Sequence, residues 1–182
     1  AAIARQLDLS RAALVLSGLD RKNLTYHVIP TKNDAAKDAT LVALLGAREH
    51  AGVAIVYAST RKTVERIALM LERAGVEAVA YHAGLDDKHR ADVQDAFMTE
   101  RARVIVATNA FGMGIDKSNV RLVVHHAMPG TLEAYYQEAG RAGRDGAPAT
   151  AILLHAFPDR FMHEFFIKGA LPERETVEAV HT

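Results

Sequence analysis

The sequence contains no cysteine and no tryptophan, and aromatic residues make up only 6% of its 182 positions. The lack of cysteine excludes disulfide bonds, thiolate zinc sites and cysteine nucleophiles within the chain. With few aromatic side chains, a core has to be built mainly from Ala, Val, Ile and Leu. The 49% hydrophobic content is enough for one compact domain and favours an α/β sandwich.

A net charge and long apolar runs are also lacking. The 22 Lys and Arg residues balance 22 Asp and Glu residues, so the chain has no broad positive field and any contact with DNA must be local. The longest apolar runs, such as 53–57, are far shorter than the ~20 residues of a membrane span. No signal peptide is recognisable. We therefore expect an intracellular protein without a membrane partner.

Short β-branched segments alternate with amphipathic ones along the chain. Six segments predict strands: 24–29, 53–57, 76–81, 104–108, 122–125 and 151–155. Most of them are apolar on both faces, as is typical of strands in a parallel sheet that helices cover on both sides. The order of elements predicts a doubly wound α/β fold.

Three amphipathic segments predict helices between these strands. Val64, Ile67, Ala68 and Leu71 recur at helical spacing, and Gly75 follows where such a helix should end. Asp86 and Thr131 are expected to cap the other two helices. Residues 157–182 predict a helical extension with a break at Leu171-Pro172. The chain begins without Met, and we expect it to be a piece of a longer protein.

The segment Gln137 to Gly146 carries two arginines among glycines. If it is helical, Gln137, Arg141 and Arg144 form one polar stripe, although each glycine inside a helix costs about 1 kcal/mol. Two guanidinium groups on a face thinned by glycine suit the dispersed charge of a transferring phosphoryl group. The alternative is a helix C-terminus, where glycine ends the helix and arginines solvate the last carbonyl groups.

Three further segments follow predicted strands, where ligands collect in open α/β sheets. Residues 107–117 contain Gly112-x-Gly114, which lacks the third glycine of a dinucleotide fingerprint, and Asp116, which could simply cap a turn. Residues 59–62 place hydroxyl groups and cations at a helix N-terminus, which fits either phosphate binding or ordinary capping. Residues 81–84 fit either a ligand contact or a surface turn.

A metal site is not expected. His125 and His126 are adjacent on a predicted strand and therefore point to opposite faces, so they cannot chelate one ion together. No pair of histidines has the helical spacing of a zinc site, and no cysteine is available.

Taken together, residues 59–61, 81–85, 107–121 and 137–146 resemble the motifs of superfamily 2 helicases, in the order found in the second RecA-like lobe. Residues 110–116 and 135–145 are similar to those of the RecQ DNA helicases. The resemblance implies a RecA-like, three-layer α/β/α domain with a mostly parallel sheet, a P-loop NTPase-like fold. Residues 1–156 would form this lobe, with 1–18 as the end of the connection between lobes. It also implies a cytoplasmic protein that is associated with the nucleoid in bacteria.

The resemblance also implies roles for individual residues. Arg144 would be the arginine finger that reaches the γ-phosphate of ATP, and Arg141 would assist it. Gln137, Asp116 and Gly114 would contact the nucleotide. The backbone of single-stranded or partly duplex DNA would be bound by the following residues: Ser59, Thr60, Arg61, His82, Gly84, Thr108 and Asn109.

The departures from the family pattern are small. Lys22 stands where the family often has proline, Ala58 where it often has cysteine, and Ser118 where proline is frequent. No Gly-x-x-x-x-Gly-Lys-[Ser/Thr] loop is present, so ATP and Mg²⁺ would be held mainly by the N-terminal lobe of the same protein. We expect this chain alone to be monomeric and inactive as an ATPase.

Two other functions remain open at this point. An RNA helicase or translocase lobe would use the same phosphate and backbone donors. A non-catalytic nucleic-acid-binding module could retain the fold, although it would have no need of both Arg141 and Arg144.

Overall fold

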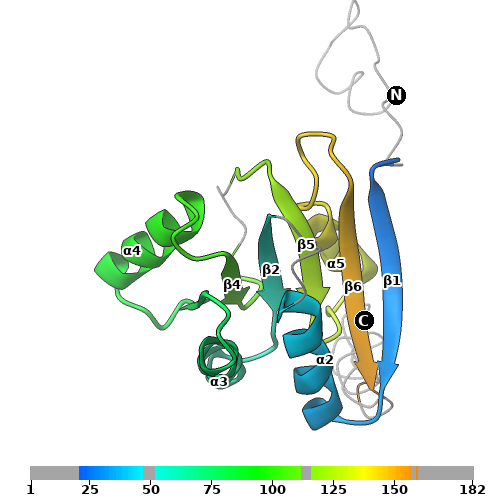
Figure 1. The fold of residues 1–182 in the computed structure, drawn as a ribbon, viewed down its shortest axis with the longest axis horizontal. Helices are drawn as coiled ribbons and strands as arrows, with labels where there is room; N and C mark the ends of the chain where they lie inside the picture. The colour runs from blue at the N-terminus through cyan, green and yellow to red at the C-terminus, as the bar shows by residue number, and fades with distance from the viewer. Residues whose placement is uncertain (1–20, 47–51, 112–115, 157–158, 160–182) are drawn as a thin grey trace, which may run out of the picture.

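The computed structural model describes residues 21–46, 52–111, 116–156 and 159, which form a parallel sheet flanked by helices (Figure 1). The strands are β1 (Leu24–Thr31), β2 (Val53–Tyr57), β3 (Ala78–Tyr81), β4 (Val104–Ala107), β5 (Val120–His125) and β6 (Ala149–Ala156). The helices are α2 (Asp34–Gly46), α3 (Arg61–Arg73), α4 (Asp87–Met98) and α5 (Leu132–Ala139). All six predicted strands are present, with boundaries that differ by a few residues.

The strands are ordered β1-β6-β5-β2-β4-β3, and every described pairing is parallel. This confirms the predicted parallel sheet. The register aligns Tyr57, Ala107 and Tyr81, so the carboxyl ends of β2, β4 and β3 meet at one edge of the sheet. At the other side of the sheet, β1 pairs with β6 from Leu24–Ala149 to Thr31–Ala156.

Helices cover both faces of the sheet and give the predicted three layers. Alternate residues of one strand enter two separate cores, as Ile55 and Val56 of β2 do. Leu41 of α2 and Ile67 of α3 pack with Val56 on one face. Phe97 of α4 and Ala139 of α5 pack with Ile55 on the other face. In Figure 1, α2 lies in front of the sheet and α5 behind it.

The predicted helix boundaries have the expected capping contacts. Asp86 caps α4 by accepting a hydrogen bond from the backbone N–H of His89 at 2.8 Å. The hydroxyl of Thr131 accepts one from the N–H of Ala134 at 3.1 Å at the start of α5. Gly75 follows α3 with a φ of +79°, a conformation that favours glycine.

Helix α2 was not predicted from the sequence. Leu41 and Leu45 pack against the sheet, but the buried position one turn before them is Lys37, which interrupts the apolar pattern. The Lys37 ammonium group is compensated by Asp159, 2.9 Å from its Oδ2, and donates to the carbonyl of His126 at 3.0 Å. The N-terminus of α2 could have been recognised in the sequence, because Asn33 is a residue type that caps helices. Its side chain accepts a hydrogen bond from the N–H of Ala36.

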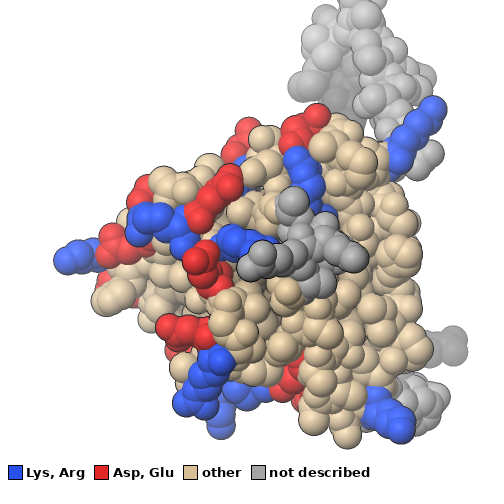
Figure 2. Space-filling model, in the orientation of Figure 1, with Lys and Arg blue, Asp and Glu red and all other residues tan. Residues whose placement is uncertain are grey.

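Charged side chains on the face seen in Figure 2 lie mostly over α3 and α4, with acidic and basic groups intermixed. This distribution agrees with the balanced composition and leaves no single positive field on that face. Within the described ranges, no helix has the length and apolar content to cross a bilayer. The predicted connection at 1–18 lies outside the described residues. So does the extension at 157–182, except for Asp159.

Candidate nucleotide and nucleic-acid interface

The residues predicted to bind DNA follow the carboxyl ends of three neighbouring strands. Ser59 and Thr60 follow β2, His82 and Gly84 follow β3, and Thr108 and Asn109 follow β4. The parallel register places these ends at the same edge of the sheet. Backbone hydrogen bonds join them, since the N–H of Ala58 donates to Ala107 at 2.9 Å and that of Thr108 to Tyr81 at 3.4 Å. The structure therefore brings this predicted group together.

Arg61 lies directly against Gly84 within this group. A Cβ atom added to Gly84 would lie 2.9 Å from the Arg61 Nη1 atom and 3.1 Å from the His82 Nδ1 atom. The bare backbone of Gly84 thus makes room for the guanidinium group. Arg61 is exposed in the first turn of α3, so its cation is available at the protein surface.

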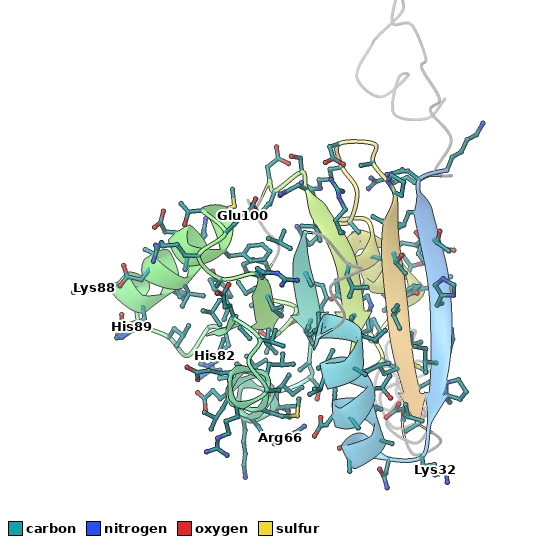
Figure 3. All side chains as sticks on the ribbon, in the orientation of Figure 1. Lys32, Arg66, His82, Lys88, His89 and Glu100 are labelled. Carbon is teal, nitrogen blue, oxygen red and sulfur yellow. The ribbon has the colours of Figure 1, made fainter. Side chains whose placement is uncertain are left out.

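His82 is 3% exposed and uses both of its ring nitrogens within the protein. Its Nδ1 accepts a hydrogen bond from the N–H of Gly84 at 3.2 Å, and its Nε2 lies 3.1 Å from Oε1 of Glu65. An accepting Nδ1 leaves Nε2 as the N–H group of a neutral ring, which donates to Glu65. Figure 3 shows His82 above helix α3, which carries Glu65. In this arrangement His82 supports the Gly84 loop.

Thr60 caps helix α3, as the capping interpretation of this segment predicted. Its Oγ1 accepts a hydrogen bond from the N–H of Thr63 at 3.1 Å and lies 2.8 Å from the Thr63 hydroxyl. Ser59 and Asn109 are exposed and Thr108 is half-buried. Capping and a nearby phosphate are compatible, because a helix N-terminus still presents free N–H groups.

The predicted stripe of Gln137, Arg141 and Arg144 does not lie on one continuous helix. Helix α5 ends at Ala139, and Gly140 is its C-cap. The chain then forms turns through Gly143, which has a φ of +62°. The backbone therefore follows the helix-end alternative, and the polar stripe, which required this whole segment to be helical, does not form. After Gly140 the backbone N–H groups of Arg141 and Ala142 donate three residues back, and the left-handed conformation of Gly143 then turns the chain away from the helix axis.

We call residues 140–147 the arginine loop. Arg21 donates from Nη1 to the carbonyl of Gly140 at 2.6 Å and from Nη2 to the carbonyl of Gly143. Asn23 donates from Nδ2 to Gly143 at 2.7 Å and to Ala147 at 2.9 Å. Residues more than a hundred positions earlier in the chain thus hold this loop from one side.

The loop is held from its other side by the start of β5. The N–H of Gly143 donates to the carbonyl of Val120 at 2.8 Å. Arg121 forms a bidentate ion pair with Asp145. Because Val120 is the first residue of β5, the arginine loop adjoins the amino ends of the strands. The backbone of the arginine loop therefore lies toward the amino ends of the strands, whereas the predicted DNA group follows their carboxyl ends.

Arg144 and Asp116, both predicted to contact the nucleotide, form an ion pair. Nη1 of Arg144 lies 2.9 Å from Oδ1 of Asp116, and the two side chains are 37% and 87% exposed. Gln137 is exposed on α5. Gly114, the remaining predicted nucleotide residue, lies outside the described residues.

Arg141 points into a buried polar cluster that sequence reasoning missed. Its Nε atom is buried and has no hydrogen-bond partner among the described residues. Burial raises the pKa of the nearby Tyr57 well above its usual range, so its hydroxyl stays protonated and donates to the carbonyl of Phe111 at 3.2 Å. His125 stacks on Tyr57 with ring centroids 5.4 Å apart and lies 2.9 Å from Glu138.

The two adjacent histidines point to opposite faces, as predicted. His125 contacts Glu138 of α5, whereas Nε2 of His126 lies 3.0 Å from Oδ1 of Asp38 in α2. Across the described ranges, no group of three potential metal-binding side chains is gathered.

The conserved C-terminal domain of helicases matches this chain over residues 36–146. The ATP-dependent DNA helicase RecQ of Pasteurella multocida is 41% identical over 98% of the chain, and the chain spans 28% of that relative's length. Two DEAD-box proteins have a similar structure. Escherichia coli SrmB, bound to the regulator of ribonuclease activity A, is 27% identical with a TM-score of 0.71, and the match covers 79% of this chain and 83% of SrmB.

The second structure is Saccharomyces cerevisiae Dbp5 bound to RNA and ADP BeF3. It is 25% identical, with a TM-score of 0.70, over 93% of this chain and 46% of Dbp5. The RecA-like α/β fold inferred from the motifs is thus supported by sequence and by structure. The chain belongs to the family of helicase conserved C-terminal domains, as a RecQ-like member.

Proposed function

We propose that this chain is the C-terminal motor lobe of an ATP-dependent DNA helicase, in which Arg144 completes the ATP site and the β2, β3 and β4 exits bind one DNA strand. The observation that carries the proposal is the placement of Arg144, which projects from a loop held at both ends by side chains and strands. A catalytic cation needs a fixed position before the reaction begins.

The ion pair with Asp116 suits a cation that is exchanged between partners. Because both side chains are substantially exposed, the pair is worth only about 0–1 kcal/mol. An arginine finger stabilises the transition state by roughly 4–7 kcal/mol, equivalent to about 10³–10⁵ in rate. Loss of the pair with Asp116 therefore costs little compared with what Arg144 would contribute in the transition state, and Asp116 would then be able to face the nucleotide.

The buried Nε atom of Arg141 also supports the assignment of this loop to the ATP site. This atom lacks a partner among the described residues, which is a cost unless a ligand or another domain completes its environment. An anionic phosphate group fits that requirement. The described carboxylates do not form a Mg²⁺ site, so we assign Mg²⁺ and most ATP contacts to the N-terminal lobe of the same protein.

The DNA strand would be bound through its backbone at the carboxyl ends of β2, β3 and β4. Arg61 supplies an exposed cation, and the start of α3 supplies backbone N–H groups. Such donors read phosphate and not base sequence. Translocation then requires that ATP hydrolysis changes the contacts with the DNA strand. The connection between β4 and β5 carries residues of both proposed sites, with Thr108 at its start and Asp116 near its end.

RNA is the second candidate substrate, because Dbp5 has a similar structure and was bound to RNA. Backbone donors alone do not distinguish the two nucleic acids. Stimulation of the full-length ATPase by single-stranded DNA, compared with RNA of the same length, separates these substrates. Stronger stimulation by RNA would replace the DNA assignment.

The test of the catalytic assignment is Arg144→Ala in the complete protein. We expect DNA-stimulated ATP hydrolysis to fall about 10³–10⁵-fold while ATP affinity and melting temperature stay close to wild type. Arg144→Lys should not restore the full rate, because an ammonium group lacks the planar fork of guanidinium.

The matched control is Arg101→Ala, which removes an exposed arginine paired with Asp95 outside the arginine loop. It should leave turnover unchanged. Should Arg144→Ala retain turnover and lower only the melting temperature, the arginine would be structural and the assignment would fail.

A further inference from the structure

The arginine loop has few side chains of its own to fix its conformation, and within the loop Asp145 accepts a hydrogen bond from the N–H of Ala147. Gly140, Gly143 and Gly146 together lack the side chains that would restrict the backbone, and glycine loses the most conformational freedom on ordering. Gly143 and Gly146 also adopt positive φ angles of 62° and 83°. A loop of this composition needs partners elsewhere in the protein if Arg144 is to stay in one position.

Arg21 and Asn23 supply such partners. The two ends of the Arg21 guanidinium group reach the carbonyls of Gly140 and Gly143, so one rigid plane spans the turn that follows α5. Asn23 reaches Gly143 and Ala147 with one amide nitrogen. The carbonyl of Gly143 thus receives donors from both side chains.

The close fit at Gly143 shows that these contacts shape the loop. A Cβ atom there would lie 2.5 Å from Asn23 Nδ2 and 2.9 Å from the carbonyl oxygen of Ala147. Asn23 therefore occupies the space that any larger residue at position 143 would need. The conformation of Gly143 and the position of Asn23 depend on each other.

We propose that Arg21 and Asn23 are positioning residues for ATP hydrolysis, holding the arginine loop so that Arg144 meets the γ-phosphate. The inference rests on the proposed catalytic role of Arg144. Neither residue touches the nucleotide in this scheme. Displacing a catalytic group by about 1 Å can cost on the order of 10²-fold in rate, so loss of the brace should reduce kcat.

The experiment compares Arg21→Ala, Arg21→Lys and Asn23→Ala in the full-length protein. Lys22→Ala is the control, because Lys22 lies between the two braces and is exposed. Arg21→Ala is expected to lower kcat of the DNA-stimulated ATPase by about 10- to 100-fold, with KM for ATP and affinity for single-stranded DNA unchanged. Arg21→Lys should recover only part of the loss, since one ammonium group cannot span two carbonyls as a planar fork. Lys22→Ala should retain the wild-type kcat.

A double variant separates positioning from general stability. If Arg21 acts through Arg144, Arg21→Ala adds no further loss of kcat in the Arg144→Ala background, because coupled residues are not additive. A full additional loss in that background would overturn the inference, and so would a wild-type kcat for Arg21→Ala. If Arg21→Ala does not fold, Arg21→Lys alone and combined with Arg144→Ala gives the same comparison. A wild-type rate for Arg144→Ala would instead refute the catalytic assignment itself.

Discussion

Residues of the predicted DNA-binding group have different environments in this protein. Arg61 is exposed beside Gly84, whereas His82 is buried and uses both ring nitrogens. In the proposed DNA-binding role, the exposed cation would contact a phosphate directly, while the imidazole would act through the loop that it supports. This distinction divides the predicted DNA-binding group into contacting and supporting residues.

Replacement of Arg61 by alanine tests the contacting role. In the complete protein it should weaken binding to single-stranded DNA independently of base sequence. It should also reduce the slope of log affinity against log salt by about 0.7, the value of one lost phosphate contact on a single strand. Arg73→Ala, at the far end of the same helix, is the control. An unchanged salt slope in Arg61→Ala would leave only the capping role of this segment.

The sequence indicated the arginines and the residues that follow the strands as candidate site residues, but it did not indicate the groups around them. In the sequence, nothing distinguishes Tyr57, His125 and Glu138 from ordinary strand and helix residues. Their contacts with one another and with Arg141 depend on how α5 packs on the sheet. Arg21 and Asn23 lie over a hundred positions from the loop that they hold. Contacts of this separation leave no local pattern in a sequence.

At the level of elements, α2, α3 and β5 are joined by one polar network. Asp38 of α2 accepts hydrogen bonds from Arg66 of α3 and lies 3.0 Å from His126, which follows β5. Burial would raise the pKa of Asp38, but the hydrogen bonds from Arg66 and His126 outweigh it and hold the pKa below its ordinary value. Burial likewise lowers the pKa of His126, even though Asp38 opposes this.

Asp38→Asn should destabilise this chain by about 1–3 kcal/mol, since it removes the carboxylate that pairs with the buried His126 as well as with the exposed Arg66. Urea unfolding at pH 7 measures the loss. Asp34→Asn is the control, because Asp34 is 78% exposed and lies 3.9 Å from its nearest cation. Equal effects of the two substitutions would contradict the importance of the network.

The two lowered pKa values also give the sign of the pH dependence. The contribution of His126 is present above its unfolded pKa of about 6.5 and is lost as the pH falls through its lower folded pKa. The contribution of Asp38 to stability is present above its unfolded pKa of about 3.9. It is lost as the pH falls through the lower folded pKa of this carboxyl group. Acid therefore weakens the fold in two steps, and Asp38→Asn should lack the lower one.

Most elements were predictable because their patterns are local. Most of the strands are apolar on both faces, and the capping residues of α3, α4 and α5 are recognisable in the sequence. Helix α2 was not predicted because Lys37 occupies a position in the core. Its charge is balanced by Asp159, which lies far along the chain. The end of α5 was ambiguous, because glycine within a helix and glycine after one look alike in a sequence.

The whole molecule presents one side of each proposed site. It carries no net charge and no phosphate-binding loop in its sequence. The arginine loop and the DNA-binding edge are both at the surface, where another lobe can complete them. The 28% of the RecQ relative that the chain spans is consistent with such a division.

The isolated chain is therefore expected not to hydrolyse ATP, with or without single-stranded DNA. Its two arginines have no bound nucleotide to act on when the other lobe is missing. Phosphate release by the purified chain measures this, and the isolated Arg144→Ala chain is the control for contaminating ATPases. Robust turnover that disappears in Arg144→Ala would contradict the two-lobe scheme.

The pairing of β1 with β6 has a consequence for biosynthesis. Leu24 and its partner Ala149 are 125 positions apart, and β6 is the only neighbour of β1 in the described sheet. At ~5–20 residues per second, a ribosome makes β1 roughly 6–25 s before its partner exists. During that interval the nascent strand has an unpaired edge, which is open to wrong partners. Arg21 and Asn23 contact carbonyl groups of residues 140–147, so the arginine loop cannot take up this conformation until residue 147 has been made.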